Sequence, residues 1–229
     1  MEEVFTASVI WILTHLGLAT NPLRGQLVAL LSERVYLLVY SGVALLALAN
    51  LIWVYTDVPR FDYQWMPNPD LYWVAKLSMP MATILLVGGF MVKNPTMVGM
   101  ERVLDQESDP ADLARGVTRI SRHPFQWAVV IWALGHLVAN GDWVSIIFFS
   151  SFVVVSGLGG WLMDRKKRAS LGDAWQPYAA VTSNVPFVAI LSGRNRLVLA
   201  ELGLPVGLGL LVYVLLYYFH EALTGAVVN

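Results

Sequence analysis

Four histidines are the side chains of this 229-residue chain that are best suited to chemistry at neutral pH: His15, His123, His136 and His220. Imidazole binds transition metals through a ring nitrogen, and it also accepts and donates protons near pH 7. The chain has no cysteine, which excludes disulfides, thiolate metal ligands and a catalytic thiol. His220 stands beside Glu221 at the end of the last apolar run, where a histidine needs no special role.

His123 and His136 lie in one segment, SRHPFQWAVVIWALGHLVANGDW at 121–143, that otherwise has the pattern of a membrane helix. Thirteen helical residues rise about 20 Å, so these two histidines belong to different sites. His123 stands at the helix start with Arg119 and Arg122. The cluster suits a phosphate, a carboxylate or a lipid headgroup, or else it is an ordinary basic anchor at the membrane surface.

His136 shares one helix face with Val129, Trp132, Ala133 and Asn140, at three- and four-residue spacing. Ionisable side chains within membrane spans rarely face lipid. A face with Trp, His and Asn therefore predicts contact with the interior of a helix bundle.

His15 has the same local pattern as His136, since WILTHL at 11–16 and WALGHL at 132–137 share Trp, Leu, His and Leu. The repeat is either chance in a Leu-rich chain or a sign of equivalent settings on oppositely directed helices. Two neutral imidazoles from separate helices can hold the iron of a b-type haem, so His15 and His136 are the predicted haem ligands. His15 falls nearer the inner end of its helix and His136 nearer the outer end of its own. The alternative is that each imidazole only hydrogen-bonds to a neighbouring helix, with Asn or Ser as partner.

The elements that position these residues are predicted from composition, which is 57% hydrophobic and 14% charged with a mean hydropathy of +0.60. Such values indicate a bilayer as the solvent. We expect an all-α, polytopic membrane protein with one domain over 1–229. Its six transmembrane helices are predicted at 4–20, 35–55, 71–92, 125–141, 143–163 and 198–219.

Basic residues divide unequally between the two sides of this six-helix topology. Only Arg60 and Lys76 of the 15 Lys and Arg fall on one side, and the others fall on the opposite side. By the positive-inside rule both termini face the periplasm or exterior, and the loops at 94–122 and 164–197 face the cytoplasm. The net charge of −1 gives no reason to expect a nucleic-acid partner; the expected partner is the lipid bilayer.

Several local features are predicted between and within the spans. Asp109 before Pro110 indicates the N-cap of a short helix, and residues 140–142 allow only a tight antiparallel hairpin. Aromatic residues in the second long loop indicate segments in the headgroup region: Trp175, Tyr178 and Phe187. Small residues indicate close helix contacts: Ser156, Gly157, Gly159, Gly160, Gly203 and Gly207.

The chain resembles the NnrU family over most of its length. The resemblance rests on His15 followed by Arg24, on ERVYLLVYS at 33–41, on TRISRHP at 118–124 and on WALGHLVANGDW at 132–143. Members are polytopic bacterial proteins, some of them linked to denitrification and nitric oxide metabolism. The resemblance therefore implies a multi-pass protein of the bacterial inner membrane.

This family is similar to the 15-cis-zeta-carotene isomerases, membrane enzymes that use haem b to isomerise a central cis double bond. Their haem ligands fall on His15 and His136, which the resemblance implies as ligands here. A redox-responsive cysteine of those enzymes falls on Ala133 in this chain. The substitution lowers the expectation of carotenoid chemistry more than that of haem binding.

A wider resemblance connects the chain to isoprenylcysteine carboxyl methyltransferases, which bind S-adenosylmethionine on the cytoplasmic side. It rests on the RHP motif and on the order of the residues that follow it: Arg122, His123, Pro124, Asp164, Gly172, Trp175, Tyr178, Val185 and Pro186. The acidic pair of those enzymes is reduced here to Asp164 followed by Arg165. The shared layout implies a common fold, which does not carry function with it.

The leading hypothesis is a haem-dependent isomerase or oxidoreductase, or a haem-dependent component of nitrogen oxide metabolism, that acts on a lipophilic substrate or a small gas. In it Trp132 and Asn140 support the iron ligands. Arg119, Arg122 and His123 hold an anionic group such as a haem propionate. The alternatives are an S-adenosylmethionine-dependent methyltransferase and a non-enzymatic membrane assembly factor.

Overall fold

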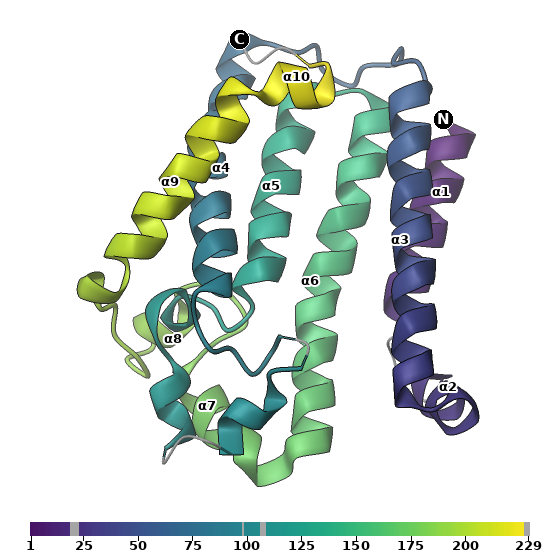
Figure 1. The fold of residues 1–229 in the computed structure, drawn as a ribbon. Helices are drawn as coiled ribbons and strands as arrows, with labels where there is room; N and C mark the ends of the chain where they lie inside the picture. The colour runs from purple at the N-terminus through teal and green to yellow at the C-terminus, as the bar shows by residue number, and fades with distance from the viewer. Residues whose placement is uncertain (19–22, 98, 106–108, 227–229) are drawn as a thin grey trace.

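The computed structural model describes residues 1–18, 23–97, 99–105 and 109–226, and over these residues the chain is helical (Figure 1). The one exception to helices and loops among them is an isolated bridge between Tyr63 and Asp142. The predicted all-α class is confirmed.

Ten α-helical segments occur in the described residues, joined by 3₁₀ turns at Glu101–Asp105, Pro110–Leu113, Gly116–Arg119, Gly172–Trp175 and Leu199–Glu201. The helices are α1 (Glu2–Ile12), α2 (Leu23–Leu31), α3 (Glu33–Asp57), α4 (Pro69–Phe90), α5 (Pro124–Asn140), α6 (Trp143–Leu171), α7 (Gln176–Val181), α8 (Val188–Leu191), α9 (Gly203–Tyr218) and α10 (His220–Thr224). A π-helical turn, Leu13–Gly17, continues α1. Each of the six predicted spans falls on one of these helices, whereas α2 was not predicted.

Three helices of the described chain are long and apolar enough to cross a membrane: α3, α4 and the helix that begins with α6. Much of the α3 surface is apolar and exposed, as at Leu38 (74%), Leu46 (72%) and Trp53 (70%), which indicates an apolar solvent. The chain is therefore a membrane protein. The helices α1, α5 and α9 are shorter, with 11, 17 and 16 residues, so six crossings remain a prediction.

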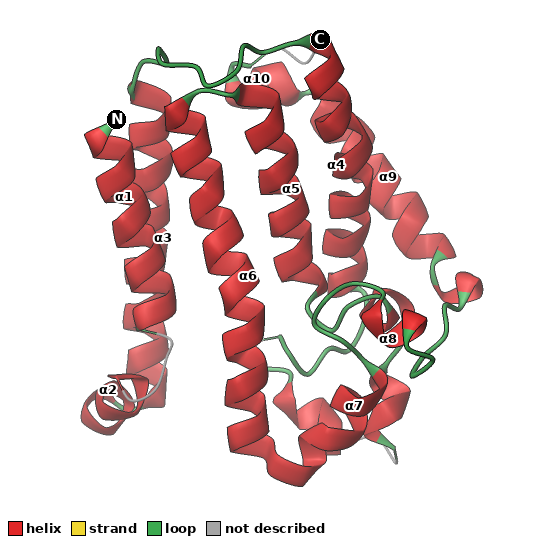
Figure 2. Ribbon diagram, turned by 180° about the vertical axis from the view of Figure 1, so that it is seen from behind, coloured by secondary structure: helices red, strands yellow, loops and turns green. Residues whose placement is uncertain are grey.

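The long helices pack in the spatial order α9, α4, α5, α6, α1 and α3, with each helix against its neighbour (Figure 1). The largest buried cluster joins α1, α3, α5 and α6 through side chains such as Trp11, Leu51, Ala133 and Phe149. Both ends of the chain lie at one end of the bundle, and α2, α7 and α8 lie at the opposite end (Figures 1 and 2).

The predicted hairpin between α5 and α6 is confirmed. Gly141 has a left-handed backbone with φ of 74°, and a Cβ there would collide with the carbonyl of Trp65. Asp142 then caps α6 by accepting a hydrogen bond from the Ser145 amide at 2.8 Å. This tight turn makes α5 and α6 antiparallel neighbours.

The small-residue prediction is partly wrong. A Cβ on Gly157, Gly159, Gly203 or Gly207 would meet no atom within 4 Å, so these glycines do not mediate close contacts. Gly160 does lie close to another segment, and Ser156 is buried. The closest helix approach on α9 is instead at Gly209, where a Cβ would lie 2.6 Å from the Cα of Ile84.

The second long loop buries two of its aromatic side chains. Trp175 and Tyr178 are 1% and 0% exposed, because they pack with Leu104 and Leu113 in a cluster of their own. These two side chains therefore face the protein, and the position of the loop in the headgroup region stays a prediction. The Asp109 cap is confirmed, since its side chain accepts from the Ala111 amide, but the helix that follows is one 3₁₀ turn.

Candidate functional site

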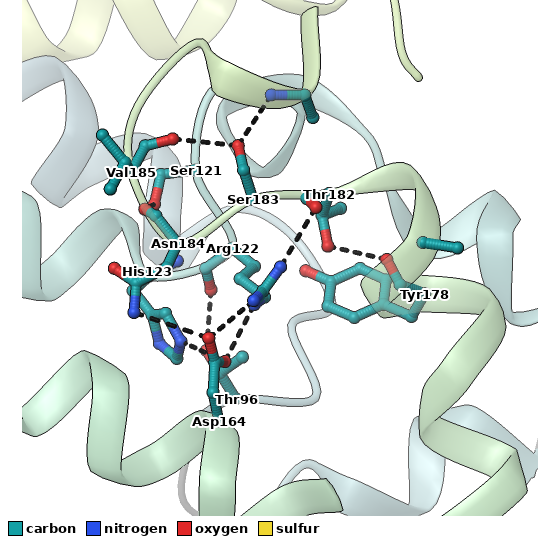
Figure 3. A network of polar contacts seen from close by, with 12 residues as sticks. Thr96, Ser121, Arg122, His123, Asp164, Tyr178, Thr182, Ser183, Asn184 and Val185 are labelled. Atoms are coloured by element: carbon teal, nitrogen blue, oxygen red, sulfur yellow. Dashed lines mark hydrogen bonds and ion pairs between the residues drawn. The ribbon is translucent and has the colours of Figure 1, made fainter. Parts of the chain in front are cut away.

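A buried polar network lies at the end of the bundle that carries α7 and α8, and it is centred on Asp164 of α6 (Figure 3). Arg122 donates from Nε and Nη2 to the two oxygens of Asp164, at 2.8 and 2.6 Å. Nε2 of His123 lies 2.7 Å from Oδ1 of Asp164. The exposed fractions of the Arg122, Asp164 and His123 side chains are 12%, 14% and 0%, so the ion pair is largely desolvated.

The backbone before α5 positions these side chains. His123 is the N-cap of α5, and its amide donates to Oγ of Ser121 at 3.1 Å. That hydroxyl donates to the carbonyl of Asn184 at 2.5 Å, which ties the entry of α5 to the loop before α8. The carbonyl of Arg122 accepts from Oγ1 of Thr96 at 2.9 Å. Segments that are distant in sequence thus meet at one carboxylate.

Burial favours the neutral form of the His123 imidazole. Burial lowers the pKa of His123, and the hydrogen bond to Asp164 opposes this shift only in part. Because Arg122 already balances the carboxylate, the neutral ring donates from Nε2 to Asp164. Its Nδ1 is then a bare acceptor, and it is buried with no hydrogen-bond partner.

Arg119 belongs to a separate pair on the same side. It donates from Nε and Nη2 to the two oxygens of Glu201, at 2.7 and 2.8 Å, and from Nη1 to Asn195 at 2.8 Å. Glu201 also accepts from the amide of Gly116 at 2.6 Å. The hydrogen bonds with Arg119 hold the pKa of Glu201 below its usual range. This contact fastens the segment before α5 to the start of α9.

The structure therefore pairs the predicted anion-binding residues with carboxylates of the protein. Arg122 and His123 contact Asp164, and Arg119 contacts Glu201. The charges of Arg122 and Arg119 are each opposed by a carboxylate, Asp164 and Glu201. Sequence reasoning did not identify Glu201, which lies 82 positions from its partner Arg119 and has no local signal. The geometry favours a structural role for these cations over the capture of a further anion.

The methyltransferase pattern falls partly within this network. Tyr178 is fully buried and donates from its hydroxyl to Oδ1 of Asn94 at 3.4 Å, and Trp175 packs against its ring at 5.5 Å between centroids. With Arg122 bound to Asp164, these polar groups satisfy one another. Arg122, Asp164, Tyr178 and Asn94 are therefore already engaged in hydrogen bonds within the protein.

His15 lies on the π-helical turn that follows α1. π-turns insert one residue into a helix and are frequent at functional sites. The His15 ring packs 4.1 Å from that of Trp11, and its backbone carbonyl accepts from the Tyr40 hydroxyl at 3.4 Å. Nδ1 of His15, Nε1 of Trp11 and Oγ of Ser8 are all buried without a hydrogen-bond partner.

His136 lies on α5, and its tautomer follows from its partner. Its Nδ1 is 2.8 Å from the carbonyl of Trp132, which can only accept, so Nδ1 carries the proton. Nε2 is left as a bare lone pair. Asn140 donates to the carbonyl of His136 at 2.7 Å, so Trp132 and Asn140 both hold this helix turn.

The two copies of the repeated Trp–His pattern pack against the same residue of α6. Trp11 and Trp132 both pack against Phe152 of α6, at 5.6 and 5.3 Å between ring centroids. Each histidine follows its Trp by four residues on helices that run in opposite directions, so the two imidazoles are offset toward opposite ends of the bundle. Within the described chain, no ring contact joins His15 to His136.

The histidine ring in contact with His136 is that of His220, for which no role was predicted. Their centroids are 6.2 Å apart and the ring planes differ by 21°. The local sequence gives no signal for this pair, because it depends on how α10 folds back over α5. No group of three or more His, Asp or Glu in the described residues has the spacing of a metal site.

His15 has an unpartnered buried ring nitrogen, and His136 has a free Nε2, so each suits a ligand of a haem iron. The donor chemistry of the two residues therefore fits the group.

Comparison with known proteins gives one family and two relatives. The family model described as "NnrU protein" matches residues 3–228. The chain is similar to chloroplastic 15-cis-zeta-carotene isomerase from Zea mays, at 25% identity over 83% of this chain and 50% of the relative. It is similar to the same enzyme from Arabidopsis thaliana, at 25% identity over 82% of this chain and 50% of the relative. No solved structure matches the chain.

Proposed function

Since the chain belongs to the NnrU family, we propose that it is a membrane-embedded, isomerase-type enzyme for an extended, lipophilic polyene. The observation that carries the proposal is the similarity to two isomerases over more than four fifths of the chain. The chain spans about half the length of these relatives, so the shared half is the membrane domain proposed to hold the activity.

The interior between α1, α5 and α6 supports this proposal. Trp11, Trp132, Phe149 and Phe152 form a continuous run of ring contacts at 5.2–5.6 Å. Such an interior is apolar and excludes water, which suits a polyene that enters from lipid. Aromatic faces would also stabilise a cationic polyene, if the isomerisation passes through one.

We propose haem b as the cofactor, with His15 and His136 as its ligands. When bound, the haem would supply one-electron chemistry at its iron, which protein side chains lack. The chain itself contributes an unpartnered imidazole at His15 and a fixed tautomer at His136.

Three other roles give different outcomes in the same experiments. A haem-dependent role in denitrification or nitric oxide metabolism predicts a haem spectrum and no change in a carotenoid. A methyltransferase predicts binding of S-adenosylmethionine and no colour, and the closed Arg122–Asp164 pair does not favour it. A non-enzymatic assembly factor predicts neither.

The first test is the oxidised and dithionite-reduced absorption spectrum of the protein purified from cells with ample haem. We expect a Soret band with reduced α and β bands, which His15→Ala or His136→Ala removes. The second test expresses the chain in a host that accumulates 15-cis-zeta-carotene, with products separated by chromatography. A colourless, folded protein contradicts the haem proposal, and unchanged carotenoid contradicts the isomerase proposal.

A further inference from the structure

We propose that the face of α6 formed by Trp161, Arg165 and Arg168 binds the headgroup of an anionic phospholipid. This face lies where α6 continues past the end of α5 toward α7 (Figure 1). Its three residues are separate from the Asp164 network and from the histidines proposed to bind the haem.

One stripe of the α6 surface is exposed to the surroundings and changes from apolar to basic along its length. Val154, Leu158 and Trp161 are 36%, 49% and 53% exposed, and Arg165 and Arg168 are exposed as well. Successive members are three or four positions apart, so all five lie on one side of the helix. The apolar part of the stripe suits acyl chains, and the basic part suits the charged group to which such chains are attached.

The length of α6 determines how deep the two arginines lie. Trp143 and Trp161 are both exposed and stand 18 positions apart, a rise of about 27 Å, which is close to the apolar thickness of about 30 Å. Tryptophan side chains gather at both boundaries of a bilayer. If Trp161 marks one boundary, Arg165 begins about 6 Å beyond it, inside a polar layer that is about 5–8 Å deep. Arg168 follows by one turn and can reach back into that layer.

The two arginines carry charge that no carboxylate of the described chain neutralises, because none of its ion pairs includes either of them. The guanidinium of Arg165 lies over the ring of Trp161, 4.9 Å from the ring centroid. Such a contact uses the charge of the guanidinium and leaves its N–H groups able to donate to a ligand. Asp164 precedes Arg165 in the sequence but binds Arg122 and His123 instead.

The surroundings of these cations determine the class of ligand. A guanidinium donates two parallel hydrogen bonds to a phosphate, and two guanidinium groups favour a ligand with net negative charge. A zwitterionic headgroup would bring its own cation beside them. A free phosphate would leave Val154 and Leu158 without a partner, whereas the acyl chains of a phospholipid cover them. An anionic phospholipid is therefore the ligand that fits both parts of the stripe.

The test titrates the protein in detergent with phosphatidylglycerol, or with phosphatidylcholine of the same acyl chains, and counts bound lipids by native mass spectrometry. We expect one tightly bound phosphatidylglycerol per chain, with an affinity about tenfold lower in the double variant Arg165→Gln/Arg168→Gln. The matched control is Arg34→Gln/Arg196→Gln. It removes the same charge from two exposed positions at the same end of the bundle, and it should bind as the wild type does.

Equal affinity for the two lipids overturns the site, and so do equal losses in the two double variants, because net charge alone would then explain the binding. Inorganic phosphate is the third probe, and displacement of the lipid by phosphate alone also overturns a lipid site. Unfolding midpoints from tryptophan fluorescence establish that each variant is folded. If the double variant does not fold, Trp161→Leu replaces it. This variant keeps both charges but loses the ring under Arg165, so its affinity should still fall, and wild-type affinity would contradict the proposal.

Discussion

Asp164 is the residue with the clearest consequence for stability, because Arg122 and His123 both depend on its carboxylate. Asp164→Asn keeps the size of the side chain but leaves the guanidinium of Arg122 with no opposing charge. Removing one partner of a largely buried pair costs about 3–5 kcal/mol. We expect a clear fall in the midpoint of thermal unfolding, followed by tryptophan fluorescence in detergent.

Asp173→Asn is the matched control, since Asp173 is exposed and lies nine positions further on. Its unfolding midpoint should stay within error of the wild type. Equal midpoints for the two variants would mean that Asp164 contributes no more than a surface carboxylate.

His123 should make stability depend on pH in a defined direction. Burial lowers its pKa in the folded state below the value of about 6.5 for an unfolded chain. The unfolded state therefore takes up the proton first, so this contribution is fully present above pH 6.5 and is lost as the pH falls toward the folded pKa. His123→Gln cannot titrate, so its midpoint should fall less than that of the wild type between pH 7.5 and 5.5. Parallel curves for the two proteins would show that His123 does not carry this dependence.

The residues with chemical potential could be identified from the sequence, but their partners could not. The sequence indicated His136, Trp132 and Asn140 as one helix face, and the structure joins them by hydrogen bonds along two successive turns of α5. It did not indicate the Arg119–Glu201 pair or the His136–His220 pair, which join positions 82 and 84 residues apart. Such pairs depend on the tertiary packing of helices, for which one chain carries no local signal.

At the scale of the elements, the contact of α9 with α4 gives a sharp test of close packing. Gly209→Ala places a Cβ 2.6 Å from the Cα of Ile84, a backbone atom that can move only with its helix. Overpacking of this kind costs about 1–3 kcal/mol. We expect a lower unfolding midpoint for Gly209→Ala.

Gly207→Ala is the control on the same helix, because a Cβ there meets nothing within 4 Å. Alanine favours a helix over glycine by about 0.5–1 kcal/mol, so this variant should be neutral or slightly more stable. Equal losses in both variants would show that α9 does not approach α4 at Gly209.

Helices were predictable where hydropathy alone defines them. The six apolar runs all became helices, and the cap at Asp109 and the turn at Gly141 followed from local chemistry. The π-turn at His15 and the burial of Trp175 and Tyr178 were not predictable. The π-turn has no composition signal, and an aromatic side chain suits a folded loop as well as a membrane interface.

At the scale of the whole molecule, the two ends of the bundle carry different chemistry. The end with α2, α7 and α8 holds the buried Asp164 network, and the opposite end holds the His136–His220 pair (Figures 1 and 3). If the basic loops face the cytoplasm, the charged network lies at the inner surface and the His136–His220 pair at the outer surface.

The absence of cysteine allows a direct test of this topology, because each introduced cysteine is the only one in the chain. The tested positions are exposed and lie near the two ends: Asp62 and Glu221 at one, Gln26 and Asp173 at the other. We expect a membrane-impermeant maleimide to label Asp62→Cys and Glu221→Cys in spheroplasts. Gln26→Cys and Asp173→Cys should be labelled only after the membrane is opened.

The labelling pattern also tests whether the short helix α9 crosses the membrane. The 16 residues of α9 rise about 24 Å, less than the apolar thickness of about 30 Å, so α9 crosses only if the bilayer thins or flanking residues reach the interface. Labelling of Asp173→Cys and Glu221→Cys from the same side would show that α9 does not cross. Complete reversal of all four results would keep six crossings and contradict the orientation predicted from Lys and Arg.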